Sequence, residues 1–506
     1  MNRLITDIIL TAWYPPTPTE ENFRQYKECG FDRIFLLGEY VDGAGTPKME
    51  KALEMCDKFG IKAFVDISGR LDLIEECIDE YIKHPSFEGF NYDEPVIYRN
   101  TLTKMDGIVD IAPVVEKMHE KYPTVEFLIN LNPTTSLKLP WGTPPFTYEE
   151  YLEAQEKYIN SIFDGSETTN WLSCDDYPVC YDPETVRHFL KDTWLRNVEY
   201  IAQAKKDSRY MLKTSFFIQV MPYGIPANLH DRVPTYEDIM LQAYTLLAFG
   251  FDSISYFCYA TPTAAEFSEH QYSMIDRSEK KTQTYFYGKK LNAILRKLNP
   301  IYKRLKNNWQ GVYPVYGDNA SERNVSFGLL KKPLASGDID EIVSARSDED
   351  ILIGYFKDED GKAGYIVVNA GDTFSAKKAK FSIRFKETEP VSVYRNGEEE
   401  IVKLTDNEFN GDLDVGEGII VLRGKKVLHG LLPIKNKKKR GKKDEKDFNS
   451  FDCDCCCIDS DGRRYRLRVR WQRKHSRTQV CRRVYLSRQN VYRRGMRTCR
   501  KGYYGA

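Results

Sequence analysis

Short apolar runs alternate with helical patterns along roughly the first 300 residues, and this alternation constrains the fold more than any other feature. The runs are continuously apolar or aromatic, as is typical of parallel strands that are buried on both faces. Eight such runs are present, at residues 7–13, 33–37, 62–67, 87–92, 125–131, 171–174, 214–221 and 253–259.

Helical patterns with start and stop signals separate the runs. Thr17 is a candidate cap, Pro18 suits the first helical position, Glu20 lies three residues after the cap, and Gly30 ends the pattern. Further helices are expected at residues 47–59, 71–82, 109–121, 148–164, 183–206, 236–249 and 284–298.

Eight strands that are each followed by a helix predict an α/β fold, a (β/α)8 TIM barrel over residues 1–304. A doubly wound open sheet is the structural alternative. The first strand is followed by no Gly-rich phosphate-binding loop, which weakens that alternative.

The sequence changes character near residue 305. Short strand patterns alternate with turn signals such as Asp360-Gly361 and Asn396-Gly397. This spacing predicts a small antiparallel β-sandwich as an accessory domain over residues 305–424. Its expected strands are 351–356, 363–369, 378–385, 391–394 and 418–422.

The formal net charge of zero hides a division of the chain. Residues 434–506 contain 24 Lys and Arg against 7 Asp and Glu, a net of +17, so residues 1–433 carry −17. The Lys-rich stretch 435–447 is typical of a disordered linker. The Arg-rich and Cys-rich end, 451–506, does not show usual zinc-ligand spacing, and a foreign or out-of-frame origin explains it more simply than a zinc or nucleic-acid module. We therefore predict a disordered basic tail over residues 425–506.

Charge and composition also bear on partners and location. The acidic body argues against nucleic acid as a partner, and no run of about 18 apolar residues predicts a membrane span. The first residues lack the features of a signal peptide, and the widely spaced cysteines of the body show no disulfide framework or metal-ligand set. We expect a cytoplasmic protein without metal or other cofactor, and its oligomeric state stays open.

In a barrel of this kind, working residues lie at the C-terminal ends of the strands. Here those ends carry carboxylates, amides and aromatic rings, which suit a neutral polyhydroxylated ligand because polar groups bind hydroxyls and rings stack on C–H faces. Without a His or Cys cluster, the set argues against a metal hydrolase or a Cys nucleophile. The candidates are Trp13, Tyr14, Glu39, Tyr40, Asp66, Ser68, Asp93, Glu94, Asn130, Asn132, Asp175, Asp176, Tyr177, Gln219, Tyr256 and Tyr259.

The strongest single feature ends the fourth predicted strand, where Asp93 and Glu94 precede Pro95. Two adjacent carboxylates repel each other, so the pKa of one should rise. A general acid that protonates a glycosidic oxygen needs such a raised pKa. The structural alternative is that one of them caps the next helix or pairs with a lysine.

Three segments carry a resemblance to a known family. The run 84–95, HPSFEGFNYDEP, resembles a segment of uncharacterised bacterial barrel proteins that are allied to the clan A glycoside hydrolases. Residues 175–178 (DDYP) and 247–257 (LAFGFDSISYF) resemble elements at their sixth and eighth strands. The resemblance covers roughly residues 5–424. It implies a hydrolase that acts on β-linked oligosaccharides or glycosides, with Glu94 as the acid/base residue.

The chain departs from this family in two places. Asp93 stands where clan A enzymes usually have Asn, and Gln219 ends the seventh strand, where their retaining members have a nucleophilic Glu. Three accounts follow. In the first account, the second carboxylate comes from Asp175, Asp176 or Glu39. A separation of about 5 Å between the two carboxyl groups would predict retention, and one of about 6.5 to 9.5 Å would predict inversion. In the second account, the acetamido group of the substrate acts as the nucleophile in place of an enzyme carboxylate. One member of the Asp93–Glu94 pair holds it. In the third account, the site binds glycan without cleaving it.

These accounts define the predicted site. The catalytic candidates are Glu94, Asp93, Asp175 and Asp176. The substrate-binding candidates are Trp13, Glu39, Asn130, Asn132, Tyr177, Gln219, Tyr256 and Tyr259.

Overall fold

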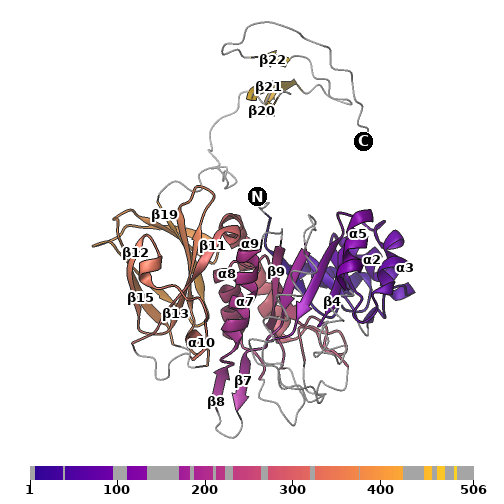
Figure 1. Cartoon of the computed structure of the whole chain (residues 1–506), viewed down its shortest axis with the longest axis horizontal. Coiled ribbons are helices and arrows are strands. Elements are labelled where there is room, and N and C mark those ends of the chain that lie inside the picture. Colours follow the sequence, from indigo (N-terminus) through magenta and orange to yellow (C-terminus); the bar gives the residue numbers. More distant parts are fainter. Residues whose placement is uncertain are drawn as a thin grey trace, which may run out of the picture. The chain divides into compact units, whose positions relative to one another are not determined.

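The computed structural model contains a closed parallel barrel that is followed by an antiparallel sandwich (Figure 1). The structure describes residues 6–37, 40–94, 111–133, 170–182, 187–208, 212–222, 232–263, 272–318, 325–374, 377–424, 450–458, 464–472 and 484–486.

All eight predicted barrel strands are confirmed. They pair in the order β1-β10-β9-β6-β5-β4-β3-β2 and the sheet closes on itself, which excludes the doubly wound alternative. Every neighbouring pair is parallel, so all the C-terminal ends meet at one mouth. The strands are β1 (Ile9–Ala12), β2 (Arg33–Leu36), β3 (Lys62–Asp66), β4 (Phe87–Asp93), β5 (Glu126–Leu131), β6 (Asn170–Cys174), β9 (Leu212–Gln219) and β10 (Ser253–Phe257).

The helices between the strands begin where the sequence places capping residues. Thr46 accepts a hydrogen bond from the Met49 amide and Pro47 opens α2, whereas α1 is capped by Thr19 rather than by Thr17. Gly60 ends α2 with a φ of 61°, a left-handed conformation that glycine adopts without a steric penalty. The helices are α1 (Glu20–Glu28), α2 (Pro47–Phe59), α3 (Asp72–Tyr81), α5 (Ile111–Lys121), α7 (Trp194–Asp207), α8 (Tyr236–Ala248) and α9 (Gln283–Leu305).

One predicted helix is wrong in its first half, and another lies outside the described residues. The segment 183–206 was expected to be helical, but α7 begins only at Trp194. Before it, β7 (Val179–Asp182) and β8 (Arg187–Leu190) form an antiparallel hairpin. A short apolar run fits a strand as well as a helix, and here pairing with β7 provides the backbone partners. The helix expected at 148–164 falls on residues that the structure does not describe.

Two sheets form the sandwich, as predicted. The larger has the order β11-β13-β14-β19-β16-β17 and the smaller β12-β15-β18. Five of these strands match the prediction, and β11, β12, β17 and β18 were missed. The bounds are β11 (Trp309–Val315), β12 (Ile342–Ser347), β13 (Ile351–Lys357), β14 (Ala363–Asn369), β15 (Ala379–Phe385), β16 (Val391–Arg395), β17 (Glu398–Val402), β18 (Glu408–Leu413) and β19 (Gly418–Arg423), with short helices α10 (Val325–Gly328), η5 (Lys306–Asn308) and η6 (Ser336–Asp338).

Helix α8 packs against β13, β14 and β19, and so joins the barrel to the sandwich (Figure 1). Two glycines permit this close approach. A Cβ at Gly354 would collide with the carbonyl of Ala248, and one at Gly418 would collide with the ring of Tyr244. Barrel and sandwich belong to one compact unit, Met1–Val427.

The remaining chain, Leu428–Ala506, forms a second unit. Three stretches of the segment that was expected to be disordered are strands of an antiparallel sheet, β20 (Ser450–Ile458), β21 (Arg464–Gln472) and β22 (Val484–Leu486). The rest of 425–506 lies outside the described residues. In the part of the chain that the structure describes, no helix is long and apolar enough to cross a membrane.

A buried ion triad lies where β10 begins. The Asp252 carboxylate receives the ammonium groups of Lys306 at 2.5 Å and Lys205 at 2.7 Å, and all three side chains are no more than 6% exposed. Asp252 also accepts the Thr214 amide of β9 at 3.0 Å. Burial alone would raise the pKa of Asp252, but the charges and hydrogen bonds of the two lysines hold it well below its usual range.

We expect Asp252→Ala to lower the free energy of unfolding by about 3–5 kcal/mol, because two buried ammonium groups would lose their partner. Urea unfolding at pH 7 measures the change. The control is Asp207→Ala, which removes an exposed partner of Lys332 and should cost less than about 1 kcal/mol. Equal effects of the two substitutions would contradict the role that we assign to the triad.

Candidate active site

Carboxylates gather at the mouth of the barrel along four adjacent strands. Asp66 ends β3, Asp93 ends β4, Glu94 follows it, and Asp175 follows β6. Because β3, β4, β5 and β6 are neighbours in the barrel, these side chains occupy one continuous arc. All four are partly buried rather than fully exposed.

Asn130, the penultimate residue of β5, joins two of these carboxylates. Its amide nitrogen donates to Oδ1 of Asp93 and to Oδ1 of Asp175, at 2.9 Å in each case. The two oxygens are therefore separated by less than twice this distance. Two carboxylates that share one donor at such close range repel each other when both are ionised.

A second set of hydrogen bonds ties Asp66 to the same group. Oδ1 of Asp66 accepts from the Ser68 hydroxyl and from the Asn91 amide, both at 2.7 Å. The Ser68 hydroxyl oxygen in turn accepts the backbone N–H of Asp93 at 2.7 Å. Asn91 and Asp93 lie two residues apart on β4 and so face the same side of the sheet.

Burial and mutual repulsion raise the pKa values in this cluster. Burial raises the pKa of Asp66 to about 6, against the hydrogen bonds from Ser68 and Asn91. Burial also raises the pKa of Asp175 to about 6, although the Asn130 hydrogen bond favours its ionised form. The pKa of Asp93 is raised well above its usual value by burial and then by the charges of Asp175 and Asp66. Burial and repulsion thus favour the protonated form of each of these carboxyl groups, against the hydrogen bonds that favour the ionised form.

Glu94 has an unusual backbone conformation at this mouth. Its φ is 38°, in the left-handed region that non-glycine residues rarely adopt, and its N–H donates to the Asn130 carbonyl at 2.9 Å. Such strain persists where the surrounding structure fixes it, and it concentrates at functional sites. Burial and the charges of Asp175, Asp176 and Glu94, in that order, raise the pKa of the Cys174 thiol, so the Glu94 carboxylate lies close to the end of β6.

Asp176 does not join the cluster, although it adjoins Asp175 in the chain. Its carboxylate accepts from the Asn197 amide on α7 at 2.6 Å and is almost fully buried. Burial raises the pKa of Asp176, and the charge of Lys191 opposes that shift. These contacts bind Asp176 to α7.

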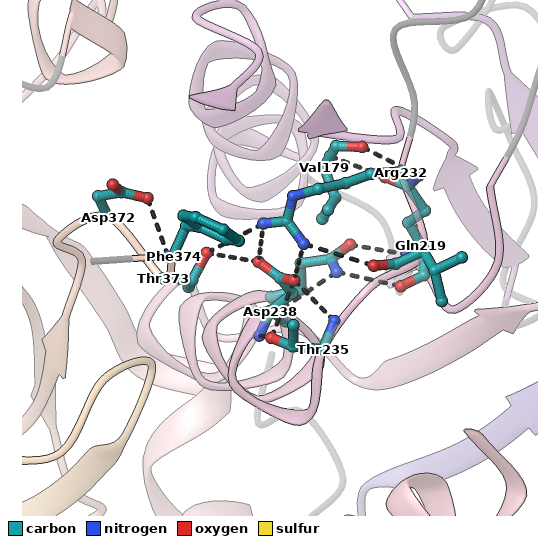
Figure 2. Close-up of polar contacts among 10 residues, drawn as sticks. Val179, Gln219, Arg232, Thr235, Asp238, Asp372, Thr373 and Phe374 are labelled. Carbon is teal, nitrogen blue, oxygen red and sulfur yellow. Dashed lines mark hydrogen bonds and ion pairs between the residues drawn. The ribbon is translucent and has the colours of Figure 1, made fainter. Parts of the chain in front are cut away.

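Gln219 is also occupied by contacts within the protein (Figure 2). Its side chain is 0% exposed; its Oε1 accepts the Val179 N–H at 2.7 Å and its Nε2 donates to the Val179 carbonyl at 3.3 Å. Its own backbone N–H donates to the Gln242 side chain at 2.7 Å. The residue at the end of the seventh barrel strand thus fixes the start of the β7–β8 hairpin, and we leave it out of the proposed site.

The four aromatic candidates of the predicted site lie in two different environments. Trp13 and Tyr177 belong to the aromatic cluster of the barrel interior, where the Trp13 ring packs 5.0 Å from Phe35 between centroids. Tyr256 and Tyr259 are fully buried against other elements: the Tyr256 hydroxyl donates to Asn292 on α9, and Tyr259 packs on Tyr26 of α1. Those two rings stabilise the packing of helices on the barrel and do not face the mouth.

Two amide and carboxylate candidates complete the predicted set. Asn132 is buried just beyond the end of β5, and Glu39 lies outside the described residues. The structure therefore brings together Asp93, Glu94, Asn130 and Asp175. It adds Asp66, Ser68 and Asn91, which are not part of the predicted site. Asp66 and Ser68 were candidates as strand-end residues, whereas Asn91 was not.

Within the described ranges, no group of three or more His, Cys, Asp or Glu side chains is placed to hold a metal ion. The Asp66, Asp93 and Asp175 carboxylates are connected by amide and hydroxyl donors, which favour the ionised form of each carboxyl group.

Comparison with known proteins gives only weak likenesses. No protein-family model and no curated protein matches the chain. Among solved structures, a GH42 β-galactosidase from G. stearothermophilus covers 83% of this chain and 98% of its own, with 8% identity and a TM-score of 0.47. A GH27 β-L-arabinopyranosidase from Geobacillus stearothermophilus covers 84% and 98%, with 10% identity and a TM-score of 0.40. An α-amylase from Anoxybacillus covers 84% and 100%, with 11% identity and a TM-score of 0.39.

All three of these neighbours are glycoside hydrolases by name. At these TM-scores and identities the likeness identifies neither a family nor an activity. The function is therefore inferred from the residues at the mouth of the barrel.

We expect Gln219→Glu to destabilise the protein by more than about 2 kcal/mol, because a carboxylate cannot donate to the Val179 carbonyl and would be buried. Thermal and urea unfolding measure the effect. Gln283→Glu, at the exposed start of α9, adds the same charge and should leave stability nearly unchanged. A Gln219→Glu protein that kept its stability and hydrolysed glycosides faster would show that position 219 faces the substrate after all.

The raised pKa values make stability depend on pH. Because the native state keeps Asp66 protonated up to about pH 6 while the unfolded chain releases the proton near 3.8, stability should fall as the pH rises through this window. Asp66→Asn removes this contribution and should raise the melting temperature by a few degrees at pH 7.5, with no gain at pH 4. The exposed Asp192→Asn should match wild type at both pH values, and the same result for Asp66→Asn would overturn the assignment.

Proposed function

We propose that the protein is a glycoside hydrolase that cleaves β-linked oligosaccharides or glycosides without a cofactor, with Glu94 as general acid/base. The arc of Asp66, Asp93, Glu94 and Asp175 at the mouth of the barrel carries this proposal. Hydrolysis of a glycosidic bond needs two carboxyl groups in different protonation states, and burial together with repulsion provides such a difference here.

The proposal gives each of these carboxyl groups a separate role. Glu94 protonates the glycosidic oxygen as the bond to the leaving group breaks. Asp175, whose pKa is about 6, is ionised at neutral pH and supplies the second carboxylate. Burial and the charges of Asp175 and Asp66 raise the pKa of Asp93, and Asn130 donates to both Asp93 and Asp175. Asp66, Ser68 and Asn91 position this group from the side of β3.

One observation favours a second function, glycan binding without cleavage. The seventh barrel strand ends in Gln219, and the amide of this residue is engaged by the Val179 backbone. A site with amides and carboxylates at its mouth binds sugar hydroxyls whether or not it cleaves the substrate. The two functions predict different results when Glu94 is replaced. A hydrolase would lose turnover, whereas a protein that only binds glycan has no turnover to lose.

We expect Glu94→Gln to lower kcat/KM on aryl β-glycosides by about 10²- to 10⁴-fold, because an amide cannot donate the proton to the leaving group. The wild-type and variant proteins are compared on a panel of aryl β-galactosides, β-glucosides, β-xylosides and N-acetyl-β-glucosaminides. Weakly basic leaving groups such as dinitrophenolate need less protonation and should suffer the smaller loss.

Glu116→Gln on the exposed face of α5 is the matched control and should keep wild-type rates. Equal rates for wild type and Glu94→Gln would contradict general acid catalysis by Glu94. If neither protein cleaves any glycoside, but oligosaccharides still raise the melting temperature of both, glycan binding is the function.

A further inference from the structure

Three rings from two parts of the fold pack together at the surface of the protein. The His188 ring of β8 lies between Tyr181 of β7, at 4.8 Å between centroids, and Phe374 of the sandwich, at 3.6 Å and nearly parallel. We refer to Tyr181, His188 and Phe374 as the aromatic platform. Phe374 is its outermost member and is 56% exposed, so one face of its ring packs on His188 while much of the ring meets solvent.

The loop that carries Phe374 is fixed to the barrel by polar contacts (Figure 2). The Thr373 hydroxyl donates to Asp238, which is fully buried and forms a two-pronged ion pair with Arg232. The Arg232 guanidinium also lies 5.9 Å from the centre of the Phe374 ring. The Phe374 N–H donates to the Asp372 side chain at 3.0 Å. The ring is thus oriented before any ligand arrives.

The aromatic platform belongs to the same end of the barrel as the carboxylates. The hairpin that carries Tyr181 and His188 follows Asp175 directly, and Gln219 and the Arg232 amide both bind its first residue, Val179. Tyr181 follows Asp175 by six positions in the chain, so the backbone allows at most roughly 22 Å between them. A chain of several sugars can span a separation within this limit.

A lone exposed phenylalanine on a protein surface needs no explanation. Phe374 differs because its ring stacks on His188 and because its loop is anchored through a buried ion pair. An exposed, flat ring that is held in place loses little conformational entropy when a ligand stacks on it. Aromatic rings bind the C–H faces of sugars in this manner, with an electropositive C–H edge against the negative ring face.

We propose that the aromatic platform is a remote sugar-binding subsite, in which the outer face of Phe374 stacks on a sugar ring of an extended oligosaccharide. The proposal rests on the proposed function for its class of ligand. It adds that the substrate is a chain of several sugars, which contacts both the barrel and the sandwich. The sandwich then contributes directly to substrate selection.

Calorimetric titration with cellohexaose, laminarihexaose and β-1,4-galactohexaose, and with the matching disaccharides, tests the proposal. The titrations use full-length Glu94→Gln protein so that substrate is not consumed. We expect Phe374→Ala to raise the Kd of the best hexaose by about tenfold and to change disaccharide binding much less. Phe374→Tyr, which keeps the flat ring, should restore hexaose binding.

The matched control is Phe286→Ala on α9, since Phe286 is 53% exposed and lies apart from the platform residues in the chain. It should leave the Kd of the hexaose unchanged. Melting temperatures establish that both alanine variants fold, and Phe374→Leu keeps apolar packing but lacks a flat ring, so it should lose affinity as alanine does.

Three results would overturn the subsite: no hexaose binds the protein, Phe374→Ala binds hexaose as tightly as its parent, or both alanine variants lose affinity equally. A failure of the proposed function is distinguishable from these. Hexaose binding that depends on Phe374, in a protein whose wild-type form cleaves no glycoside, would support the subsite and reject the hydrolase.

Discussion

One buried carboxylate joins two strands of the barrel to a helix and to the segment that leads into the sandwich. Asp252, at the start of β10, binds Lys205 of α7, Lys306 at the end of the barrel and the backbone of β9. Lys306 lies in the segment between α9 and the first strand of the sandwich. Closure of the barrel and attachment of the sandwich therefore share one electrostatic centre, and the arrangement at the opposite ends of the strands depends on both.

At those opposite ends, the parallel barrel brings like charges together. A closed parallel sheet directs every C-terminal strand end to one mouth, so Asp66, Asp93 and Asp175 approach each other regardless of their repulsion. Donors from Ser68, Asn91 and Asn130 offset part of this cost, and protonation offsets more. Neutral residues at these positions would avoid the repulsion, so we expect them to make the fold more stable.

The sequence predicted the barrel because its strands are buried on both faces and therefore form continuous apolar runs. It also placed Asp93, Glu94 and Asp175 at one mouth, since strand ends in a barrel converge. Sequence position alone could not show that Asp175 joins the other carboxylates while Asp176 binds α7. The distinction depends on a hydrogen bond from Asn197, which lies twenty-one residues after Asp176 in the chain. Strand β17, with Glu398, Glu399 and Glu400 at a sheet edge, lacks the apolar alternation that predicts a strand.

Two glycines, which have no side chain, set the spacing between the barrel and the sandwich. At Gly354 and Gly418 the sheet touches α8 with no Cβ between them, so this distance has no tolerance for an added methyl group. We therefore do not expect that the sandwich could be exchanged for another domain that is attached to the barrel only through a linker. A replacement domain would also need glycine at both positions that contact α8. Without this close approach, Phe374 would no longer lie over the hairpin of the barrel.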